Sequence, residues 1–514
     1  MLRAALLLLA LSACDALGEH ESAMARPAPN LVLFLVDDLG WQDTSVAFSG
    51  VSGPFQEHFE TPHLAALAAH GLVFSEAHAQ CVCTPTRLSI LTGQNSARHG
   101  TTNWIRDAAQ ETSGSTAVLG PPPRWRSAGY RDGTPTLPGL LAAHGYRTIH
   151  VGKAHFGAVG TPAADPRTLG FDVNVAGHAA GAPGSYQGEN GYDRAGETGP
   201  SVWAVPGLER FHGTPTHLTD ALTIRALEEV EHAVAEGRPF FLELAHYAVH
   251  VPLEPHDPYT QHFRALGHDE SEARYAAMVA GVDASLGAVL AKLEHLGVAE
   301  QTLIAFTSDN GGLSAHARGT SAVGGGVDTH NAPLRAGKGS AYEGGTRVPL
   351  VFAWARSAPS HPTQRALPVV TGRTDTLSLS EDLCATFLAA AGVSAPAEID
   401  GRDLAPVLAG GAGERQRALL FHYPHVWGPS GAGYEPHSAL RRGDWKVLYF
   451  YGDERWELYD LAHDLGEQDD RAKKESVRLA ELAGELCARL AQLSAPLPLE
   501  LASGRERAPR LPGR

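Results

Sequence analysis

Short apolar runs that end abruptly in polar residues recur along this chain, and they constrain its fold more than any other feature. Turn residues bound each run, and the four clearest runs cover Leu31 to Val36, Thr148 to Val151, Phe240 to Leu244 and Leu303 to Thr307. Because these runs lack the polar alternation of a half-exposed strand, they predict strands buried on both faces, as in a parallel sheet.

Helical patterns lie between these runs. Residues Thr61 to Gly71 combine an N-cap threonine, a proline at the first helical position, spaced leucines and a terminating glycine. Leu137 to His144 and Ser285 to His295 repeat the pattern. Alternating strands and helices predict an α/β fold, a large mostly parallel sheet sandwiched by helices. Ligands of such sheets bind beyond the carboxyl ends of the strands, so the polar residues ending the runs are expected to converge on one site.

The sequence pattern changes after about residue 410. Ser438 to Tyr451 and Trp456 to Leu461 predict short antiparallel strands, and leucines from Leu479 to Leu493 then follow helical spacing. We therefore predict a main domain over residues 30–410, a smaller α+β C-terminal domain over residues 411–501, and a disordered tail over the Pro-, Gly- and Arg-rich residues 502–514. A chain of 514 residues is long enough for two hydrophobic cores.

The overall charge narrows the classes of partner. The chain has 57 acidic and 41 basic residues, a net charge of -16. This balance argues against binding to nucleic acid or to an anionic membrane surface, which requires a basic face. Any site for an anion must therefore be local.

The N-terminus has the form of an export signal. Arg3 precedes the apolar run from Ala4 to Leu11, which is too short to span a bilayer, and no later stretch of the sequence looks transmembrane. Leu11-Ser12-Ala13-Cys14 resembles the bacterial lipobox, which implies a signal peptide over residues 1–13, a lipid on Cys14 and a tether over residues 14–29. Cleavage after Ala23-Met24-Ala25 is the alternative, and it would discard Cys14. Either way we expect an exported protein of the periplasm or cell envelope.

The most specific stretch is Cys83-Thr84-Pro85-Thr86-Arg87, followed by Leu91-Thr92-Gly93. Pro85 suits the first turn of a helix, which would place Cys83 at the helix N-terminus. Unpaired N–H groups and the helix dipole favour an anion there and activate a thiol. The other cysteines of the mature chain are scattered, with Cys384 and Cys487 in predicted helices where core packing is expected, and Cys81 has no assigned role.

Two acidic motifs end predicted strands. Asp37-Asp38 follows the first strand and Asp309-Asn310 follows a late one. These residues offer only oxygen ligands, which suits Ca²⁺ or Mg²⁺ and not Zn²⁺, which prefers His and Cys.

With these motifs in order, the chain resembles the type I, formylglycine-dependent sulfatases of the alkaline phosphatase superfamily. Their signature Cys-x-Pro-x-Arg, then Leu-Thr-Gly, is matched, with Thr86 where Ser is most common. Three further segments match the family and carry Lys153 and His155 (Gly152 to Gly157), His250 (Ala248 to Pro252, with Val249 in place of a proline) and Lys338 (Ala332 to Gly339). The resemblance extends from Asn30 to Asp470.

The resemblance implies an alkaline phosphatase-like fold and a mechanism. A separate maturation enzyme would oxidise Cys83 to formylglycine, whose hydrate attacks sulfur. Ca²⁺, with Mg²⁺ as the alternative, would be bound by Asp37, Asp38, residue 83, Asp309 and Asn310. Lys153 and Lys338 would bind the sulfate oxygens, and His250 or Lys338 would protonate the departing alcohol. His155 would take the proton from the second hydroxyl, and Arg87 would steady the hydrate.

The substrate is less defined by the sequence. The Gly-rich stretch over residues 170–215 contains Tyr186, Tyr192, Trp203 and His212 and is long for a structureless connection. It could wall a pocket for a carbohydrate sulfate rather than a small aryl sulfate, or it could be a plain surface insertion. Two other functions stay open: a phosphonate or phosphodiester hydrolase of the same superfamily, and a non-catalytic lipoprotein that binds sulfated glycans.

Overall fold

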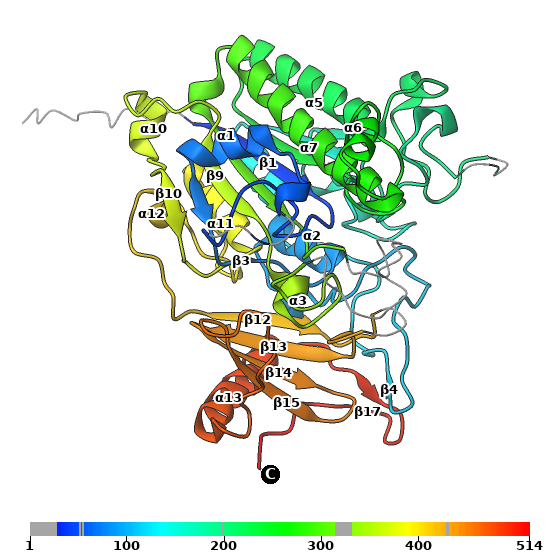
Figure 1. Cartoon of the computed structure of the whole chain (residues 1–514), viewed down its shortest axis with the longest axis vertical. Helices are drawn as coiled ribbons and strands as arrows, with labels where there is room; N and C mark the ends of the chain where they lie inside the picture. The colour runs from blue at the N-terminus through cyan, green and yellow to red at the C-terminus, as the bar shows by residue number, and fades with distance from the viewer. Residues whose placement is uncertain are drawn as a thin grey trace, which may run out of the picture.

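The computed structural model describes residues 28–513 except 51–52, 54–55, 195, 197–198, 314–330 and 428–430. The predicted signal peptide, Cys14 and nearly all of the predicted tether therefore lie outside the described residues. Figure 1 shows a larger part that contains the main sheet and most helices, above a smaller part built on the C-terminal strands.

The larger part is organised around one sheet of eight strands, in the order β10-β2-β9-β8-β1-β7-β5-β6. Every neighbouring pair is parallel except the two that involve β9. The four strands predicted from the apolar runs form its centre. Their bounds, in sheet order, are β8 (Thr302–Ser308), β1 (Asn30–Val36), β7 (Phe240–Ala245) and β5 (Arg147–Gly152). The outer strands are β10 (Gly372–Thr374), β2 (Leu72–Phe74), β9 (Leu350–Trp354) and β6 (Val173–Val175).

Helices cover both faces of this sheet, which confirms the predicted α/β class. All seven residues of β1 are buried, and its alternate side chains belong to two different cores. Val32 and Phe34 pack with α1 (Pro62–His70), α5 (Leu218–Ala235) and α7 (Glu270–His295). Leu31 and Leu33 pack on the other face, with α2 (Cys83–Thr92), α4 (Leu137–Ala143) and α11 (Asp382–Ala390). Burial on both sides explains why the apolar runs show no alternation.

Helix α7 is longer than predicted. The pattern indicated Ser285 to His295, but the helix begins at Glu270, where the Asp269 side chain accepts hydrogen bonds from Ser271 N and Glu272 N. By length and hydropathy α7 could cross a membrane, yet 61% of its most apolar window is buried inside the protein. Its packing against α1, α5 and α6 (Tyr259–Ala265) is that of a core helix.

The smaller part contains an antiparallel sheet and one long helix. Its strands are β12 (Ala418–Tyr423), β13 (His437–Arg442), β14 (Trp445–Phe450) and β15 (Arg455–Asp460), paired in that order. Helix α13 (Ser476–Gln492) packs on this sheet through the leucines that marked it in the sequence. Half-buried Cys487 lies on this helix, whereas Cys384 is fully buried in α11.

The prediction of a disordered tail is wrong for the residues that the structure describes. Strands β16 (Leu499–Glu500) and β17 (Arg505–Glu506) pair with each other, and β16 also pairs with β4 (Leu119–Gly120). Arg124 binds Glu506 at 2.7 Å, and Trp456 Nε1 donates to the Arg510 carbonyl at 2.8 Å. The composition of the tail did not predict this order, because its charged and carbonyl groups bind residues that are far away in the sequence.

Candidate active site

The predicted site residues meet at the carboxyl ends of four adjacent strands. Asp37 and Asp38 follow β1, Lys153 and His155 follow β5, His250 follows β7, and Asp309 and Asn310 follow β8. In the sheet these strands are direct neighbours, in the order β8-β1-β7-β5. The topology therefore brings together side chains that are widely separated in sequence.

Cys83 is the first residue of α2, as the proline two residues later predicted. Its N-cap residue, Val82, is extended and supplies no side-chain cap, so the first N–H groups of α2 stay available near residue 83. One turn later, Arg87 Nε donates to Asp309 Oδ2 at 2.8 Å and Arg87 Nη1 donates to the Lys153 carbonyl at 2.7 Å. Arg87 thereby ties α2 to the ends of β8 and β5.

His155 faces Cys83 with one ring nitrogen. Its Nε2 lies 2.6 Å from the Ile105 carbonyl, which can only accept, so Nε2 carries the proton and Nδ1 has a free lone pair. Nδ1 lies 3.4 Å from Cys83 Sγ and 3.1 Å from Thr84 Oγ1. Burial, and then the charge of Lys153, lower the pKa of His155 well below its usual value. The ring is therefore neutral and presents a proton acceptor to residue 83.

Two lysines bind different carboxylates of the acidic cluster. Lys153 Nζ lies 2.6 Å from Asp37 Oδ2, and Lys338 Nζ lies 2.6 Å from Asp38 Oδ1. Burial opposes the charge of Lys338, but Asp38 and other acidic groups outweigh it and raise the pKa of Lys338. The loop of Lys338 is fixed by main-chain bonds, including one from Gly339 N to the Cys81 carbonyl at 2.7 Å. Cys81 thus has a structural position beside the site, and burial raises the pKa of its thiol.

His250 is the most accessible of the six predicted catalytic residues. Its side chain is 16% exposed, whereas the other five residues are buried. His250 Nδ1 lies 2.8 Å from the Val251 carbonyl, and Nε2 lies 3.6 Å from Asp38 Oδ2. Burial and the nearby Lys338 charge lower the pKa of His250 to about 3.

The acidic cluster has the donor set of a hard cation site. Ligand oxygens of Asp37, Asp38 and Asp309 lie within 4.8 Å of one another, and all three residues are buried. Asp37 Oδ1 and Asn310 Oδ1 are buried without a hydrogen-bond partner among the described residues. Burial, and then Asp309, raise the pKa of Asp37 even though Lys153 opposes this. A divalent cation would satisfy these oxygens, and an all-oxygen set fits Ca²⁺ or Mg²⁺. Cys83 is not a member of this group.

Three further residues lie near the site; Thr84 and Trp427 carried no functional signal in the sequence, and Tyr186 was noted only as part of a stretch that could wall a pocket. Thr84 contacts His155, and the Tyr186 hydroxyl lies 2.6 Å from the Tyr247 carbonyl and 2.8 Å from the His250 carbonyl. Trp427, from the segment after β12, has its ring centroid 5.6 Å from Lys338 Nζ. Thr84 occupies a variable position of its motif, and the other two contacts join distant segments, so no local pattern could have revealed them.

Only some of the aromatic residues in the stretch that was expected to wall a sugar pocket are accessible to a ligand. Tyr186 and Tyr192 are fully buried, so they support the insertion over residues 170–215 from within and do not face a ligand. Trp203 is half-exposed and His212 is exposed. The insertion also contains β6 and two short 3-10 helices, η4 (Gly188–Asn190) and η5 (Glu209–Phe211).

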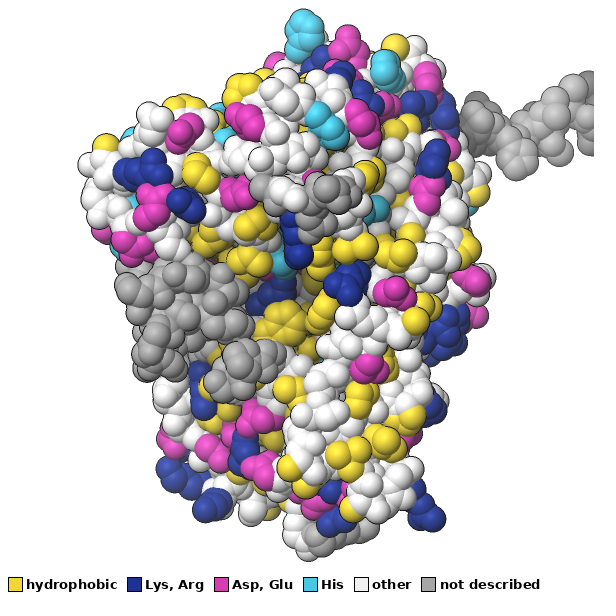
Figure 2. Space-filling model, turned by 90° about the vertical axis from the view of Figure 1, so that its right-hand side faces the viewer, with side chains coloured by type: hydrophobic (Ala, Val, Ile, Leu, Met, Phe, Trp, Pro, Cys, Tyr) yellow, Lys and Arg dark blue, Asp and Glu magenta, His cyan; other side chains and the backbone are white. Residues whose placement is uncertain are grey.

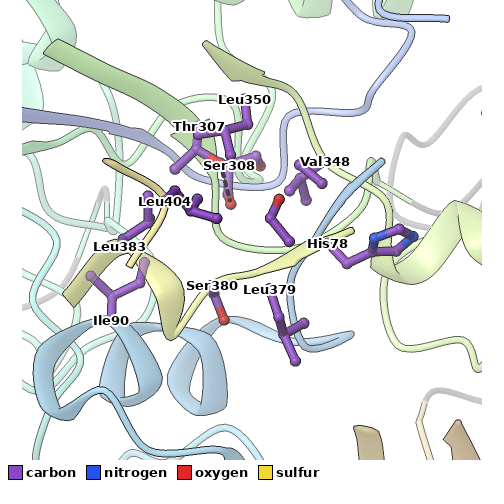
Figure 3. A pocket seen from close by; sticks show the side chains of 12 residues that line it. His78, Ile90, Thr307, Ser308, Val348, Leu350, Leu379, Ser380, Leu383 and Leu404 are labelled. Atoms are coloured by element: carbon purple, nitrogen blue, oxygen red, sulfur yellow. Dashed lines mark hydrogen bonds between the residues drawn. The ribbon is translucent and has the colours of Figure 1, made fainter. Parts of the chain in front are cut away.

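The surface shows where a ligand can enter. Figure 2 shows a hollow in the middle of one face, surrounded by hydrophobic, His and Lys or Arg side chains. The cavity of Figure 3, between β8, α2 and α11, is different: its volume of about 10 Å³ has room for no more than one water-sized molecule. That cavity is therefore too small to be a substrate site.

Comparison with known proteins decides the family. The Sulfatase family model matches residues 29–393. The chain belongs to the sulfatase family of the alkaline phosphatase superfamily. A second model, N-sulphoglucosamine sulphohydrolase, C-terminal, matches residues 337–495 of the sulfatase.

Individual relatives agree with this assignment. A "Sulfatase" of Formosa agariphila is 29% identical over 494 residues, which covers 86% of this chain and 84% of that protein. The N-acetylgalactosamine-6-sulfatase of Canis lupus familiaris is 32% identical over 419 residues, 79% of this chain and 70% of that protein. The crystal structure of Ps i-CgsB superposes with a TM-score of 0.71 at 26% identity, covering 90% of this chain and 93% of that one. The sulfatase is thus a sulfuric ester hydrolase, and its predicted fold is confirmed.

Proposed function

We propose that the sulfatase removes sulfate from carbohydrates, with residue 83 as the nucleophile. The observation that carries the proposal is the position of Cys83 at the start of α2, facing His155 Nδ1, at the same strand ends as two lysines and three carboxylates. Two relatives support the substrate class: the one named N-acetylgalactosamine-6-sulfatase, and Ps i-CgsB, which was crystallised with k-i-k-neocarrahexaose.

The nucleophile in this proposal is a modified Cys83. A separate maturation enzyme would oxidise the thiol to formylglycine, whose hydrate supplies a hydroxyl for attack on sulfur. The available N–H groups at the start of α2 favour the negative charge that develops there. Arg87, anchored on Asp309 and the Lys153 carbonyl, fixes the first turn of α2 and with it the position of residue 83.

The remaining side chains bind sulfate and move protons. Lys153 and Lys338 would turn from Asp37 and Asp38 to the sulfate oxygens. As the bond between sulfur and the alcohol oxygen breaks, the alcohol receives a proton, for which Lys338 and His250 are the two candidates. Both stay candidates, because Lys338 Nζ and His250 Nε2 border the same carboxylate, at 2.6 Å and 3.6 Å from Asp38 oxygens. His155 Nδ1 would then take the proton of the second hydroxyl of residue 83, so that sulfate leaves and the aldehyde re-forms.

A bound divalent cation would supply a Lewis-acid charge beside the sulfate. Asp37, Asp38, Asp309 and Asn310 would bind it, with Ca²⁺ preferred over Mg²⁺ from the family resemblance. We expect Asp309→Ala to lower kcat/KM by on the order of 100-fold or more. Substitution of a metal ligand, or of a residue that orients one, lowers activity by factors of this size. Chelation of the unmutated enzyme should do the same, and Ca²⁺ should restore only the unmutated enzyme. Full activity of Asp309→Ala in chelator would contradict the assignment.

The substrate class is tested with the full chain, co-expressed with a maturation enzyme. We expect turnover of sulfated saccharides, slower turnover of aryl sulfates, and little hydrolysis of aryl phosphonates. Preferential phosphonate hydrolysis would favour the alternative hydrolase function. Mass spectrometry of the peptide that contains Cys83 tests the non-catalytic alternative, since a thiol that stays unmodified under these conditions would support binding without catalysis.

A further inference from the structure

Two arginines share one tryptophan next to the proposed site. The guanidinium carbon of Arg106 lies 5.6 Å from the centre of the Trp203 ring, and that of Arg194 lies 5.1 Å from it. Trp203 and Arg106 are half-exposed and Arg194 is exposed, so the cluster borders solvent. Arg194 and Trp203 come from the insertion over residues 170–215, whereas Arg106 comes from a loop that follows α3 (Ser96–His99).

Both segments of this cluster touch His155. Arg106 directly follows Ile105, whose carbonyl accepts the hydrogen bond from His155 Nε2 at 2.6 Å. The Trp203 carbonyl accepts from Gly184 N at 2.8 Å, and three residues before Gly184 the chain passes His155. A Cβ atom added to Gly181 would lie 2.4 Å from His155 Cε1, so this contact leaves no room for a side chain. The cluster therefore belongs to the wall of the site on the His155 side.

Neither arginine side chain forms an ion pair with a described residue, although Asp193 precedes Arg194 in the chain and accepts a hydrogen bond from Arg194 N at 2.7 Å. No carboxylate of a described residue lies within ion-pair distance of either guanidinium, and Arg106 donates only to the neutral Gln110 amide. Arg210, in the same insertion, provides a contrast: its guanidinium lies 4.6 Å from the Phe211 ring centre but binds Glu228 at 2.6 Å. In a chain of net charge -16, this ring therefore has two guanidinium groups beside it that form no ion pair with a described residue.

Such an arrangement fits an anionic ligand. A guanidinium group offers paired N–H donors that match the oxygens of a sulfate or a carboxylate, and two such groups in one cluster favour negative charge there. The tryptophan face holds both groups in place by cation–π attraction and also offers an apolar surface to a sugar ring. Figure 2, which faces the side of the molecule where the insertion lies in Figure 1, shows Lys or Arg side chains around the central hollow.

We propose that Arg106, Arg194 and Trp203 form a subsite for a second negative group on the substrate, a sulfate or a carboxylate near the sulfate that is removed. The inference rests on the proposed function and narrows it: the preferred substrates are polyanionic saccharides rather than saccharides with a single sulfate.

The test uses the full, matured chain and three saccharides that share the scissile sulfate. One has no other charge, one has a second sulfate, and one has a uronic acid carboxylate. The variants are Arg106→Gln, Arg194→Gln, the double variant, and Arg210→Gln as the matched control. We expect the double variant to lose about 10-fold in kcat/KM on a doubly charged saccharide, mostly through KM, because two partly exposed charge pairs contribute a few-fold each. Activity on the singly charged saccharide should change less than about 3-fold.

The outcomes separate this subsite from the proposed function. A selective loss on the second sulfate or on the carboxylate identifies which group the subsite binds. Equal losses on all three saccharides, no loss, or the same loss in Arg210→Gln would overturn the subsite. If the matured enzyme hydrolyses none of them, the proposed function fails instead. The subsite is then tested by calorimetric titration of the same proteins with the disulfated and monosulfated saccharides, where equal affinities would refute it.

Discussion

Two residues of the site, Asp38 and His155, adopt left-handed backbone conformations, with φ of 60° and 58°. Neither is glycine, and such conformations store strain of roughly 1–3 kcal/mol when the surrounding structure enforces them. Asp38 N donates to Asp309 Oδ1 at 3.2 Å, and His155 N donates to the His178 carbonyl at 3.1 Å. These bonds aim the Asp38 carboxylate at Lys338 and the His155 ring at residue 83.

The position of His155 predicts a split between the two halves of the reaction. Its Nδ1 faces residue 83, so His155→Ala should still release alcohol once but release sulfate about 100-fold or more slowly, the usual contribution of a proton-transfer group. Rapid mixing of the matured variant with a chromogenic sulfate should show a burst of one alcohol per active site before a slow steady rate.

The control for this experiment is Thr84→Val, which removes the hydroxyl that contacts His155 Nδ1 but leaves the ring. This variant should show no burst. If His155→Ala loses the first alcohol release as completely as Cys83→Ala, then His155 serves attack or sulfate binding and not sulfate release.

At the scale of elements, helix α1 does not begin as its sequence indicated. Thr61 makes no side-chain cap; its hydroxyl instead lies 2.8 Å from Ser45 Oγ. The cap comes from α7, where the Asp283 carboxylate accepts from His63 N at 3.0 Å and from Leu64 N at 2.8 Å. One buried carboxylate therefore joins two helices that cover the same face of the sheet.

We expect Asp283→Ala to lower the free energy of unfolding by about 1–3 kcal/mol, because it leaves two N–H groups of α1 buried without an acceptor. Urea unfolding followed by circular dichroism measures this change. Asp269→Ala, which removes the exposed cap of α7, is the comparison and should cost about 1 kcal/mol or less. A smaller effect at Asp283 than at Asp269 would mean that α1 finds another cap.

At the scale of the whole molecule, buried ion pairs connect the C-terminal sheet to helix α9 of the larger part. Lys446 on β14 lies 2.9 Å from Glu343, and Arg441 on β13 lies 3.2 Å from it. Glu343 begins α9 (Glu343–Thr346), five residues after Lys338. The C-terminal sheet thereby supports the segment that carries a predicted catalytic lysine.

Buried histidines in the smaller part predict a loss of stability in acid. His422, on β12, lies 2.8 Å from the Pro496 carbonyl, and burial lowers its pKa to about 4. The unfolded chain binds a proton near pH 6.5 and the folded chain only near pH 4, so this stability is present above pH 6.5 and is lost as the pH falls toward 4. Between pH 7 and pH 5 the loss from one such histidine is about 2 kcal/mol.

The variant His422→Gln isolates this effect. It removes the titrating ring, so the fall in melting temperature between pH 7 and pH 5 should be smaller than in the unmutated protein. His144→Gln, at an exposed position after α4, is the control and should leave the fall unchanged. An equal fall in all three proteins would assign the acid sensitivity to other groups.

We propose that the whole protein is exported and anchored to a membrane by a lipid on Cys14. Among the described residues the one helix long and apolar enough to cross a membrane is α7, and it is mostly buried in the core. Acyl chains on Cys14 would supply an anchor instead. In its native host the protein should fractionate with membranes, and Cys14→Ala should release it into the soluble fraction. A soluble unmutated protein would instead support cleavage after Ala25.

Local sequence was sufficient to predict the central strands and the residues at their ends. A strand buried on both faces must be apolar throughout, so β1, β5, β7 and β8 are visible as uninterrupted runs, and their common direction makes the polar residues that follow them neighbours. Cys83, likewise, was placed at a helix start by the proline two residues later. The prediction that these residues converge on one site rested on the parallel topology together with the family resemblance.

Contacts between distant segments could not be predicted in this way. The acceptor for Leu64 N lies 219 residues away on α7, β16 pairs with β4, and Arg106 and Arg194 reach the Trp203 ring from separate loops. Hydrophobic periodicity and capping signals act over a few residues, whereas hydrogen-bond partners and charge neighbours depend on how the layers pack. The sequence therefore specified the strands and the polar residues at their ends. Only the packing of the folded chain decided which other side chains support these residues and which charged groups lie beside the site.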